Sequence, residues 1–379
     1  MLQPLIDATP AGGTLRLAPG DYLGPARIGR PLTLQGGGRA TLSGGGAGTV
    51  LAVAGRDVTV RGLRVTGSGD SHDAIDAGIQ IEGDNHRIED NDIYDVLFGI
   101  HLKNAHHVRV VGNRVTGKPR ETGMRGDALR LWYGTKNRIE DNTFRRGRDI
   151  TLINAPDNTL VGNSFDDGRY GMHIVFSPRL LVERNRLSHT GTGIVVLYSP
   201  GLTLRGNHVA HAMGGGGGGM VFKESDAALV EGNEVLHCTA GLKVDAPPEP
   251  IGVLTVRNNR FAHNLVGLFV YGEAGGHVFS GNRFEHNLTQ VAVSAPGVGR
   301  ANQWRDNYWD DYQGFDRNGD GVGDTPHEVY LFADRIWLES PMATFFRNSP
   351  ALELLDLLER LAPFSAPHLL LRDAAPRMK

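Results

Sequence analysis

Apolar and polar residues alternate along most of this chain in a short pattern that centres on an asparagine. The pattern runs apolar-x-apolar-x-x-Asn-x-apolar, as in Val-Arg-Val-Val-Gly-Asn-Arg-Val at residues 108–115. Alternation with a period of two places the apolar side chains on one face of a β-strand, so these stretches predict strands and not helices. The asparagine recurs at intervals of 21 to 29 residues, at Asn91, Asn113, Asn142, Asn163, Asn185, Asn207, Asn233, Asn259, Asn282 and Asn307. A repeat of this length is typical of a solenoid.

Each repeat continues, after a glycine, into another short apolar strand, for example at residues 99–102, 193–196 and 267–270. Short strands repeated without intervening helical segments predict an all-β chain, a right-handed parallel β-helix of about 11 to 12 coils. The recurring asparagine is expected to satisfy backbone groups at a tight bend and to stack on its equivalents as a ladder. That role explains the fold and says nothing about function.

The pattern divides the chain into three regions. Residues 1–57 form an N-terminal cap and irregular first coils, in which residues 2–8 predict a short capping helix. The regular β-helix occupies residues 58–300. Residues 301–379 form a C-terminal cap with an Asp-rich loop, and leucines within 351–361 predict a short amphipathic helix. Two repeats carry insertions, at residues 116–127 and 212–219, and such insertions usually map to loops on one side of a solenoid.

Composition narrows the function classes. The net charge of −3 removes the electrostatic argument for binding nucleic acid. A single cysteine, Cys238, excludes internal disulfides and cysteine-based zinc or redox motifs. No apolar run is long enough to span a membrane. The first residues lack the apolar segment of a signal peptide, so the chain is either cytosolic or the exported form from which a leader has been removed.

The sharpest local motif is Asp-Arg-Asn-Gly-Asp-Gly-Val-Gly-Asp at residues 316–324. Its spacing matches a calcium-binding loop, with oxygen ligands at positions 1, 3, 5, 7 and 9 and a glycine at position 6 for the sharp turn. The position that carries glutamate in an EF-hand holds His327, and no flanking helices are expected. The motif therefore predicts a structural calcium site, or else a metal-free turn. The predicted ligands are Asp316, Asn318, Asp320, the carbonyl of Val322, and Asp324.

A histidine follows five successive ladder asparagines by four residues, at His189, His211, His237, His263 and His286. Equivalent positions in neighbouring coils lie about 4.8 Å apart, so the imidazoles are expected to form a column. Imidazoles at that spacing suit a borderline metal, and copper is favoured among divalent ions. The alternative is a polar bend at which residue types interchange, as Asp95 and Arg146 do in earlier coils. Met172 and His173 are a further candidate pair for copper, with ordinary packing as the alternative.

Several aspartates raise the possibility of an enzyme. Carbohydrate-active β-helices use two or three acids from adjacent coils on one face. The candidates here do not fall in one column, and no adjoining coil supplies a consistent histidine or arginine partner, so no catalytic residue is predicted. They are Asp70, Asp73, Asp76, Asp149, Asp166 and Asp167.

Three segments resemble signature sequences of the NosD family. They are Tyr-Gly-Met-His-Ile-Val-Phe-Ser at residues 170–177, Asn-Tyr-Trp-Asp-Asp-Tyr-Gln-Gly-Phe-Asp at residues 307–316 with the Asp-rich loop after it, and Ala-Pro-Gly-Asp-Tyr-Leu-Gly at residues 18–24. The resemblance covers essentially the whole chain. It implies a periplasmic, copper-binding accessory protein for nitrous oxide reductase that works with an ABC transporter, consisting of an ATPase and a membrane subunit, to mature the copper–sulfur centre of the enzyme.

The same resemblance implies further partners and a location. The reductase is the expected client, a copper chaperone is a further expected partner, and residues 350–371 are expected to dock on the transporter, which would hold the chain at the inner membrane. We interpret the sequence as a non-enzymatic assembly factor that holds copper or the client protein. The alternative is a calcium-assisted lyase or hydrolase acting on acidic polysaccharide.

Overall fold

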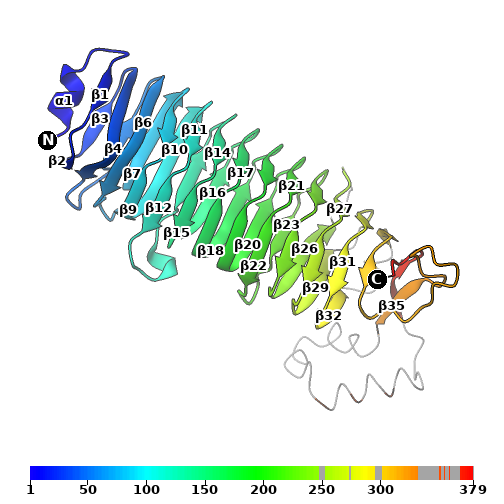
Figure 1. The fold of residues 1–379 in the computed structure, drawn as a ribbon. Helices are drawn as coiled ribbons and strands as arrows, with labels where there is room; N and C mark the ends of the chain where they lie inside the picture. The colour runs from blue at the N-terminus through cyan, green and yellow to red at the C-terminus, as the bar shows by residue number, and fades with distance from the viewer. Residues whose placement is uncertain are drawn as a thin grey trace.

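In the computed structural model the chain winds into a right-handed parallel β-helix of about 12 turns, with helix α1 at one end and strand β35 at the other (Figure 1). The predicted fold class is therefore confirmed. The structure describes residues 1–246, 252–272, 275–294, 301–331 and 368–378, together with the single positions 350, 354 and 358. Within these residues, no helix has the length and apolar character needed to cross a membrane.

Within the described residues, thirty-four strands pair in parallel as three sheets that run the length of the solenoid. The first sheet contains the strands that precede the ladder asparagines: β1 (Thr14–Arg16), β4 (Leu32–Ser43), β6 (Val58–Thr66), β8 (Arg87–Glu89), β11 (Arg109–Val111), β14 (Arg138–Glu140), β17 (Thr159–Val161), β19 (Leu181–Glu183), β21 (Thr203–Arg205), β24 (Leu229–Glu231), β27 (Thr255–Arg257), β30 (Val278–Ser280) and β33 (Gln303–Arg305).

The second sheet contains the strands that follow those asparagines, and β4 and β6 extend into it. Its other strands are β2 (Gly20–Leu23), β9 (Asp92–Val96), β12 (Arg114–Gly117), β15 (Thr143–Arg145), β18 (Ser164–Val175), β20 (Arg186–Leu197), β22 (His208–Ala212), β25 (Glu234–Leu236), β28 (Arg260–Ala262), β31 (Arg283–Glu285) and β34 (Tyr308–Trp309).

The third sheet closes each turn, and the second halves of β18 and β20 belong to it. Its other strands are β3 (Ala26–Ile28), β5 (Leu51–Val53), β7 (Ala77–Asp84), β10 (Phe98–His106), β13 (Leu129–Trp132), β16 (Asp149–Ile153), β23 (Met220–Lys223), β26 (Ala240–Ala246), β29 (Val266–Gly272) and β32 (Thr289–Val293).

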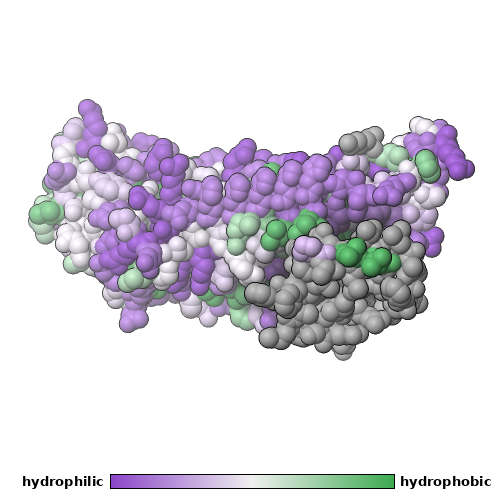
Figure 2. Space-filling view, turned by 90° about the horizontal axis from the view of Figure 1, so that it is seen from below, coloured by the Kyte–Doolittle hydropathy of each residue, from purple (hydrophilic) through white to green (hydrophobic). Residues whose placement is uncertain are grey.

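The core is a narrow column of apolar side chains enclosed by the three sheets. Val110, Ile139 and Leu160 pair on successive rungs of the first sheet, and all three are fully buried. Because side chains alternate along a strand, their neighbours point to solvent, which produces the polar exterior. Seen from below, hydrophilic residues form a band along the solenoid, and hydrophobic residues gather beside it toward the C-terminal coils (Figure 2).

The asparagine ladder forms as the sequence predicts. All ten side chains are buried, and each of the first nine amides donates to the Oδ1 atom of the next asparagine at 2.9 to 3.0 Å. Asn185, for example, also donates from Nδ2 to the carbonyl of Leu160 at 2.9 Å. The ladder therefore pairs backbone groups that the bend leaves inside the molecule, which would otherwise be costly to bury.

Both ends of the solenoid are closed. At the N-terminal end, α1 (Gln3–Ala8) buries Ile6, and its preceding residue Leu2 is also buried, which confirms the predicted capping helix. At the other end, β35 (His327–Leu331) pairs antiparallel with β36 (His368–Asp373). Asp373 accepts hydrogen bonds from the backbone and side-chain nitrogens of Asn307, at 3.1 and 2.8 Å, and so takes the place of a further asparagine.

The insertion at residues 116–127 forms a loop with one short 3₁₀ turn, η1 (Thr122–Met124), and it protrudes beside β12 and β15 (Figure 1). Lys118 pairs with Asp70 in the loop before β7, and Arg125 pairs with Asp167 at 2.9 Å. Ion pairs to two other coils therefore fix this loop. The helix predicted at 351–361 and most of the tail at 350–371 lie outside the described residues, and the predicted region boundaries stay predictions.

Candidate functional site

The five histidines that follow the ladder asparagines form one continuous column on the surface. Neighbouring imidazole centroids are 5.1 to 5.2 Å apart from His189 to His286, and the first four rings are parallel to within 10°. The strands before them pair in register, which sets this spacing. The column predicted from the sequence is present as a geometric arrangement.

The backbone at these positions explains why the side chains point outward. All five histidines have a positive φ, between 51° and 58°, at the bend that follows the second sheet. Asp95, Arg146 and Asp167 adopt the same conformation at equivalent positions of earlier coils. The bend needs a residue that adopts the left-handed backbone conformation and can face solvent. The fold does not otherwise restrict the type of residue at this position.

The column is exposed and lies between two carboxylates. The side chains of His189 and His286 are 64% and 67% exposed, and their Nδ1 atoms lie 2.7 Å from Asp166 and 3.1 Å from Asp310. Partial burial lowers the pKa of His211, and the neighbouring imidazoles of His189 and His237 lower it further. The lowered pKa favours the neutral form of His211, in which an imidazole nitrogen can bind a metal.

The stacked arrangement does not itself form a closed metal site. Imidazole lone pairs lie in the plane of the ring, and a bound ion sits about 2.0 Å from each nitrogen, so two ligating nitrogens lie at most about 4 Å apart. Parallel rings 5.1 Å apart must tilt toward each other before they can share an ion. In the described part of the chain, no group of three or more His, Cys, Asp or Glu residues is positioned to hold a metal.

Two sulfur-containing residues lie next to the column in sequence. Met213 is 56% exposed, whereas Cys238 is buried, and its Sγ donates to the carbonyl of Leu236 at 3.2 Å. Burial raises the pKa of the Cys238 thiol to about 11, so it is not a thiolate at neutral pH. Of these two side chains, only that of Met213 is exposed.

The structure separates the predicted pair Met172 and His173. Met172 is fully buried in the core, whereas His173 lies on the outer face of the third sheet. Successive residues of a strand point to opposite faces, so the Met172 sulfur and the His173 imidazole do not converge on one ion. Burial lowers the pKa of His173.

The Asp-rich loop is exposed, and hydrogen bonds from its own backbone order it. Asp316 accepts from the N–H groups of Gly319, Asp320 and Gly321 at 2.7 to 3.2 Å. Asp324 accepts from the N–H of Arg317 at 2.7 Å, so both ends of the loop are tied together. Carboxylate, amide and carbonyl oxygens are the ligand types that Ca²⁺ takes. The three carboxylates of the loop are not grouped as a metal site in the described structure, so the calcium site stays a prediction.

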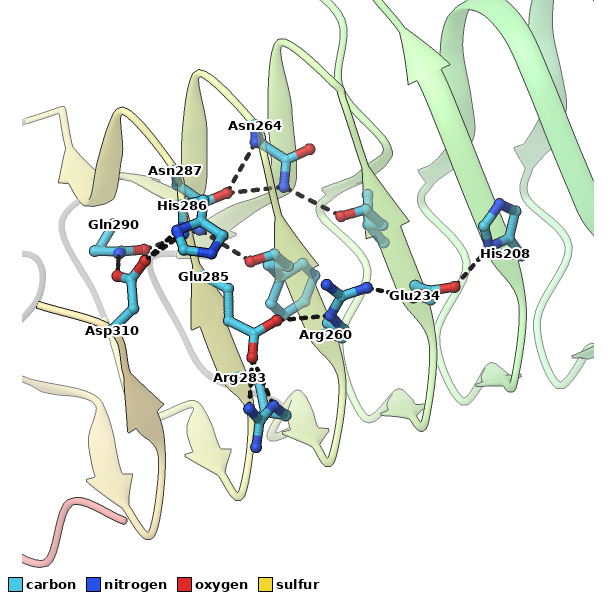
Figure 3. A network of polar contacts seen from close by, with 12 residues as sticks. His208, Glu234, Arg260, Asn264, Arg283, Glu285, His286, Asn287, Gln290 and Asp310 are labelled. Carbon is cyan, nitrogen blue, oxygen red and sulfur yellow. Dashed lines mark hydrogen bonds and ion pairs between the residues drawn. The ribbon is translucent and has the colours of Figure 1, made fainter. Parts of the chain in front are cut away.

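A network of ion pairs lies beside the last histidines of the column (Figure 3). Arg260 bridges Glu234 and Glu285, at 2.6 and 2.7 Å, and Glu285 also accepts from Arg283. Burial alone would raise the pKa of Glu285, but the two guanidinium groups outweigh it and the pKa is lowered. A pocket at the end of the column is lined by His286, Asp310, Tyr308, Tyr312 and Met378, among others. This pocket was not predicted from the sequence.

Two of the candidate aspartates have basic partners, although the sequence showed no consistent histidine or arginine partner in an adjoining coil. Asp149 pairs with Arg169 and Arg148, and Asp70 pairs with Lys118 and Arg120. Arg148 directly precedes Asp149 in the sequence, whereas Arg169 comes from the next coil and Lys118 and Arg120 from the inserted loop, so most of these pairs were not visible from spacing along the chain. Asp127, which the sequence analysis overlooked, is fully buried and pairs with Arg130 and Arg148.

Sequences of known family match this chain over nearly its whole length. A family described as "Periplasmic copper-binding protein (NosD)" matches residues 116–314. The "Probable ABC transporter binding protein NosD" of Pseudomonas aeruginosa is 30% identical over 97% of this chain and 88% of its own length. The chain belongs to the NosD family. A second member, from Stutzerimonas stutzeri and of the same name, is 28% identical over 96% of this chain and 86% of its own length. The resemblance predicted from three sequence segments is confirmed.

Solved structures share the fold of this NosD family member. The A-module of the Azotobacter vinelandii mannuronan C-5 epimerase AlgE6 superposes with a TM-score of 0.62 at 13% identity, over 80% of this chain and 93% of that one. The A-module of the epimerase AlgE4 gives a TM-score of 0.61 at 11% identity, over 76% and 92% of the two chains. At such low identity the likeness shows only that the β-helix is shared.

Proposed function

We propose that this chain is a periplasmic, non-enzymatic assembly factor that acts with an ABC transporter in maturing the copper–sulfur centre of nitrous oxide reductase. The observation that carries the proposal is the column of five stacked, exposed imidazoles in a member of a family described as copper-binding. The names of the relatives, which refer to ABC transporter binding, support the transporter as partner. In this view copper is cargo that the chain receives and passes on.

The column offers copper a series of equivalent two-nitrogen sites. Side chains such as His189 and His286 are more than half exposed, so they can turn about χ1 and χ2 without disturbing the core. Tilting two neighbouring rings brings two nitrogens within the roughly 4 Å that one ion requires. Five histidines give four such neighbouring pairs, so an ion can move along the column by exchanging one imidazole for the next.

Copper titration of single variants tests this arrangement. His237→Asn removes a ligand shared by two neighbouring pairs, whereas His189→Asn removes one pair at the end of the column. We expect a competition titration with a Cu(I) chelator to show fewer bound ions in both variants, with the larger loss in His237→Asn. His107→Asn, an exposed histidine outside the column, is the matched control and should bind as the wild type does. Unchanged copper binding after replacement of all five histidines would remove the column from the proposal.

The partner part of the proposal needs its own experiment. We expect an affinity-tagged chain to co-purify from detergent-solubilised membranes of its source cells with an ABC-type ATPase and a membrane subunit. The reductase and a copper chaperone are the next expected partners. Recovery of the chain alone, under conditions in which the ATPase and the membrane subunit stay together, would contradict the transporter assignment.

We also propose that Asp316, Asn318, Asp320, the Val322 carbonyl and Asp324 bind Ca²⁺. The loop is joined to the C-terminal residues, because the N–H of Gly323 donates to the carbonyl of Pro376 at 2.8 Å and Met378 donates to Gly321. Met378 also lines the pocket beside His286. A calcium ion would therefore stabilise the wall of that pocket, a structural role without direct chemistry.

A further inference from the structure

The outer face of the third sheet carries a line of polar side chains in its earlier coils. His101, Arg130, Thr151 and His173 occupy one register position on strands β10, β13, β16 and β18. In the next two coils the same position holds Val195 and Val221. Rungs lie about 4.8 Å apart, so the four polar residues form a continuous track along the solenoid.

Buried ion pairs hold the arginines beside this track. Asp127 accepts from Arg130 at 3.0 Å and from Arg148 at 2.9 Å, and Asp149 accepts from Arg169 and from the N–H of Tyr170 at 3.0 Å. Both carboxylates are fully buried. Within the described residues, three guanidinium groups thus share two carboxylates, which leaves one positive charge uncompensated. Arg148 contacts both carboxylates. Asp127 and Asp149 therefore act together to fix the positions of the three arginines.

Three polar atoms on adjacent rungs of the track have no hydrogen-bond partner within the described ranges. They are Nδ1 of His101, Nε of Arg130 and Oγ1 of Thr151. His101 and Thr151 are only 3% and 2% exposed. An unpaired buried polar group costs about 1–3 kcal/mol, and folded proteins rarely keep three together. A ligand that reaches these groups recovers that cost.

The protonation state of His101 and the aromatic rings beside the arginines indicate which class of ligand fits the track. Burial lowers the pKa of His101 to about 4, and Arg130 and Lys103 act in the same direction, so the imidazole is neutral at pH 7. Trp132 lies under the guanidinium of Arg130 at 4.7 Å, and Tyr170 lies under that of Arg169 at 4.4 Å. The face therefore combines one excess cation, neutral hydrogen-bonding groups and aromatic rings.

We propose that this track binds a saccharide that carries a carboxylate. The carboxylate takes the uncompensated charge of Arg130 and Arg169, and ring hydroxyls pair with the Thr151 hydroxyl and the His101 imidazole. Arg130 lies between His101 and Thr151 on the track. Its side chain is 16% exposed and stays above Trp132 on its ion pair with Asp127, and its Nε, unpartnered in the described ranges, is the donor left for the ligand. An extended surface of this kind is what a solenoid typically offers to a long ligand.

Binding of trigalacturonate to the full chain tests the proposal, with neutral galactotriose and acetate as comparison ligands, measured by calorimetry at pH 7. We expect trigalacturonate to bind, with an affinity that falls as salt is raised, and galactotriose to bind at least tenfold more weakly. No binding of trigalacturonate would overturn the proposal, and so would equal affinity for galactotriose. Equal affinity for acetate would also overturn it, because the face would then recognise a bare anion.

Two threonine variants separate binding from folding. Thr151→Val removes a hydroxyl without changing the volume of the side chain, and we expect about fivefold weaker trigalacturonate binding with no loss of thermal stability. Thr190→Val is the matched control, because the Thr190 hydroxyl is also buried and unpartnered in the described structure but lies outside the track. It should bind as the wild type does. Unchanged trigalacturonate binding in Thr151→Val would show that the track is not the binding site. Such a result would leave the outcome of the copper and transporter experiments unaffected.

Discussion

Two columns of side chains run along the same coils, four residues apart, and they obey different rules. The asparagine column is buried, and each amide bonds to the next coil and to the backbone. The histidine column is exposed, and its rings stack without hydrogen bonds between them in the described structure. The β-helix requires the amides, because the bend leaves backbone groups inside the protein. It does not require the imidazoles, because Asp95 and Arg146 occupy the same bend in other coils.

The difference indicates where function is to be sought in a solenoid. A repeat that satisfies buried backbone groups is explained once the fold is explained. A run of one residue type at an exposed, permissive position is not explained in this way. Five consecutive histidines at such a bend therefore call for a role outside folding, which is why the proposed copper path lies there.

Breaking the asparagine column should have the largest effect on stability. Asn185→Leu leaves the Asn163 backbone N–H and one of the two Asn163 Nδ2 hydrogens without an acceptor, and the Leu160 carbonyl without its side-chain donor. With about 1–3 kcal/mol for each unpaired group, we expect a loss of about 3–5 kcal/mol in urea unfolding. His189→Asn, four residues later, should change the free energy of unfolding by less than about 0.5 kcal/mol. Similar losses of unfolding free energy in the two variants would show that the two columns contribute equally to stability, against this prediction.

Removing the residue that ends the ladder should have the next largest effect. Asp373→Ala removes the acceptor of the Asn307 backbone N–H and of the Trp309 indole N–H, and it leaves Asn307 Nδ2 with only its bond to the Phe279 carbonyl. We expect a loss of about 2–3 kcal/mol, since water reaches the end of a solenoid more easily than its middle. Asp373→Asn keeps an acceptor oxygen and should lose less. The check is thermal unfolding together with limited proteolysis of the last coils, and a wild-type digestion pattern in Asp373→Ala would contradict the capping role.

Acid should distinguish buried histidines from those of the exposed column. The pKa of His101 falls from its ordinary 6.5 to about 4 in the folded chain, mainly through burial. As the pH falls, the unfolded chain binds a proton at this histidine at a higher pH than the folded chain does. The stability that depends on a neutral His101 is therefore present above pH 6.5 and is lost as the pH falls toward 4. This amounts to about 2 kcal/mol between pH 7 and pH 4.5. In urea titrations at the two pH values, His101→Gln should show a smaller loss than the wild type, whereas His263→Asn should lose as much as the wild type.

The smallest effect concerns the Asp-rich loop. At free calcium of about five times the dissociation constant, binding should add about 1 kcal/mol to the free energy of unfolding. Asp320→Ala should lower the melting temperature only when calcium is present. A matched scan with EDTA is the control, and an equal loss with and without calcium would show that Asp320 acts through hydrogen bonds alone, such as the one it accepts from the Val322 N–H.

The features predicted from the sequence were those that repeat. Asn113 and its equivalents recur because every bend has the same unpaired groups, so their spacing was sufficient to predict the fold and the ladder. A second ladder escaped notice because its members differ in type. The N–H of Ala155 donates to Ser177, Ser177 to Ser199 and Ser199 to Ser225, each through a side-chain hydroxyl at 2.8 to 3.0 Å. Serine, asparagine and histidine all satisfy that bend, so no single letter recurs.

The polar face of the third sheet escaped prediction for a different reason. Asp127 belongs to an insertion, and its partner Arg148 begins the next coil of the sheet, so the pair depends on how the inserted loop folds back. Alternation identified the strands but could not show which long side chains meet across coils. The histidine column was predictable because its members lie at a fixed distance from residues that were themselves recognisable.

The closing contact of Asp373 with Asn307 has a consequence for the speed of folding. Most rungs of the ladder join residues 21 to 29 positions apart, so each coil can add to the one before it by closing a short loop. The last rung joins residues 66 positions apart. Bringing distant residues together costs more chain entropy and slows the step that needs it. The final coil should therefore form last, and until then its unpaired strand edge is the part of the chain most open to pairing with another molecule.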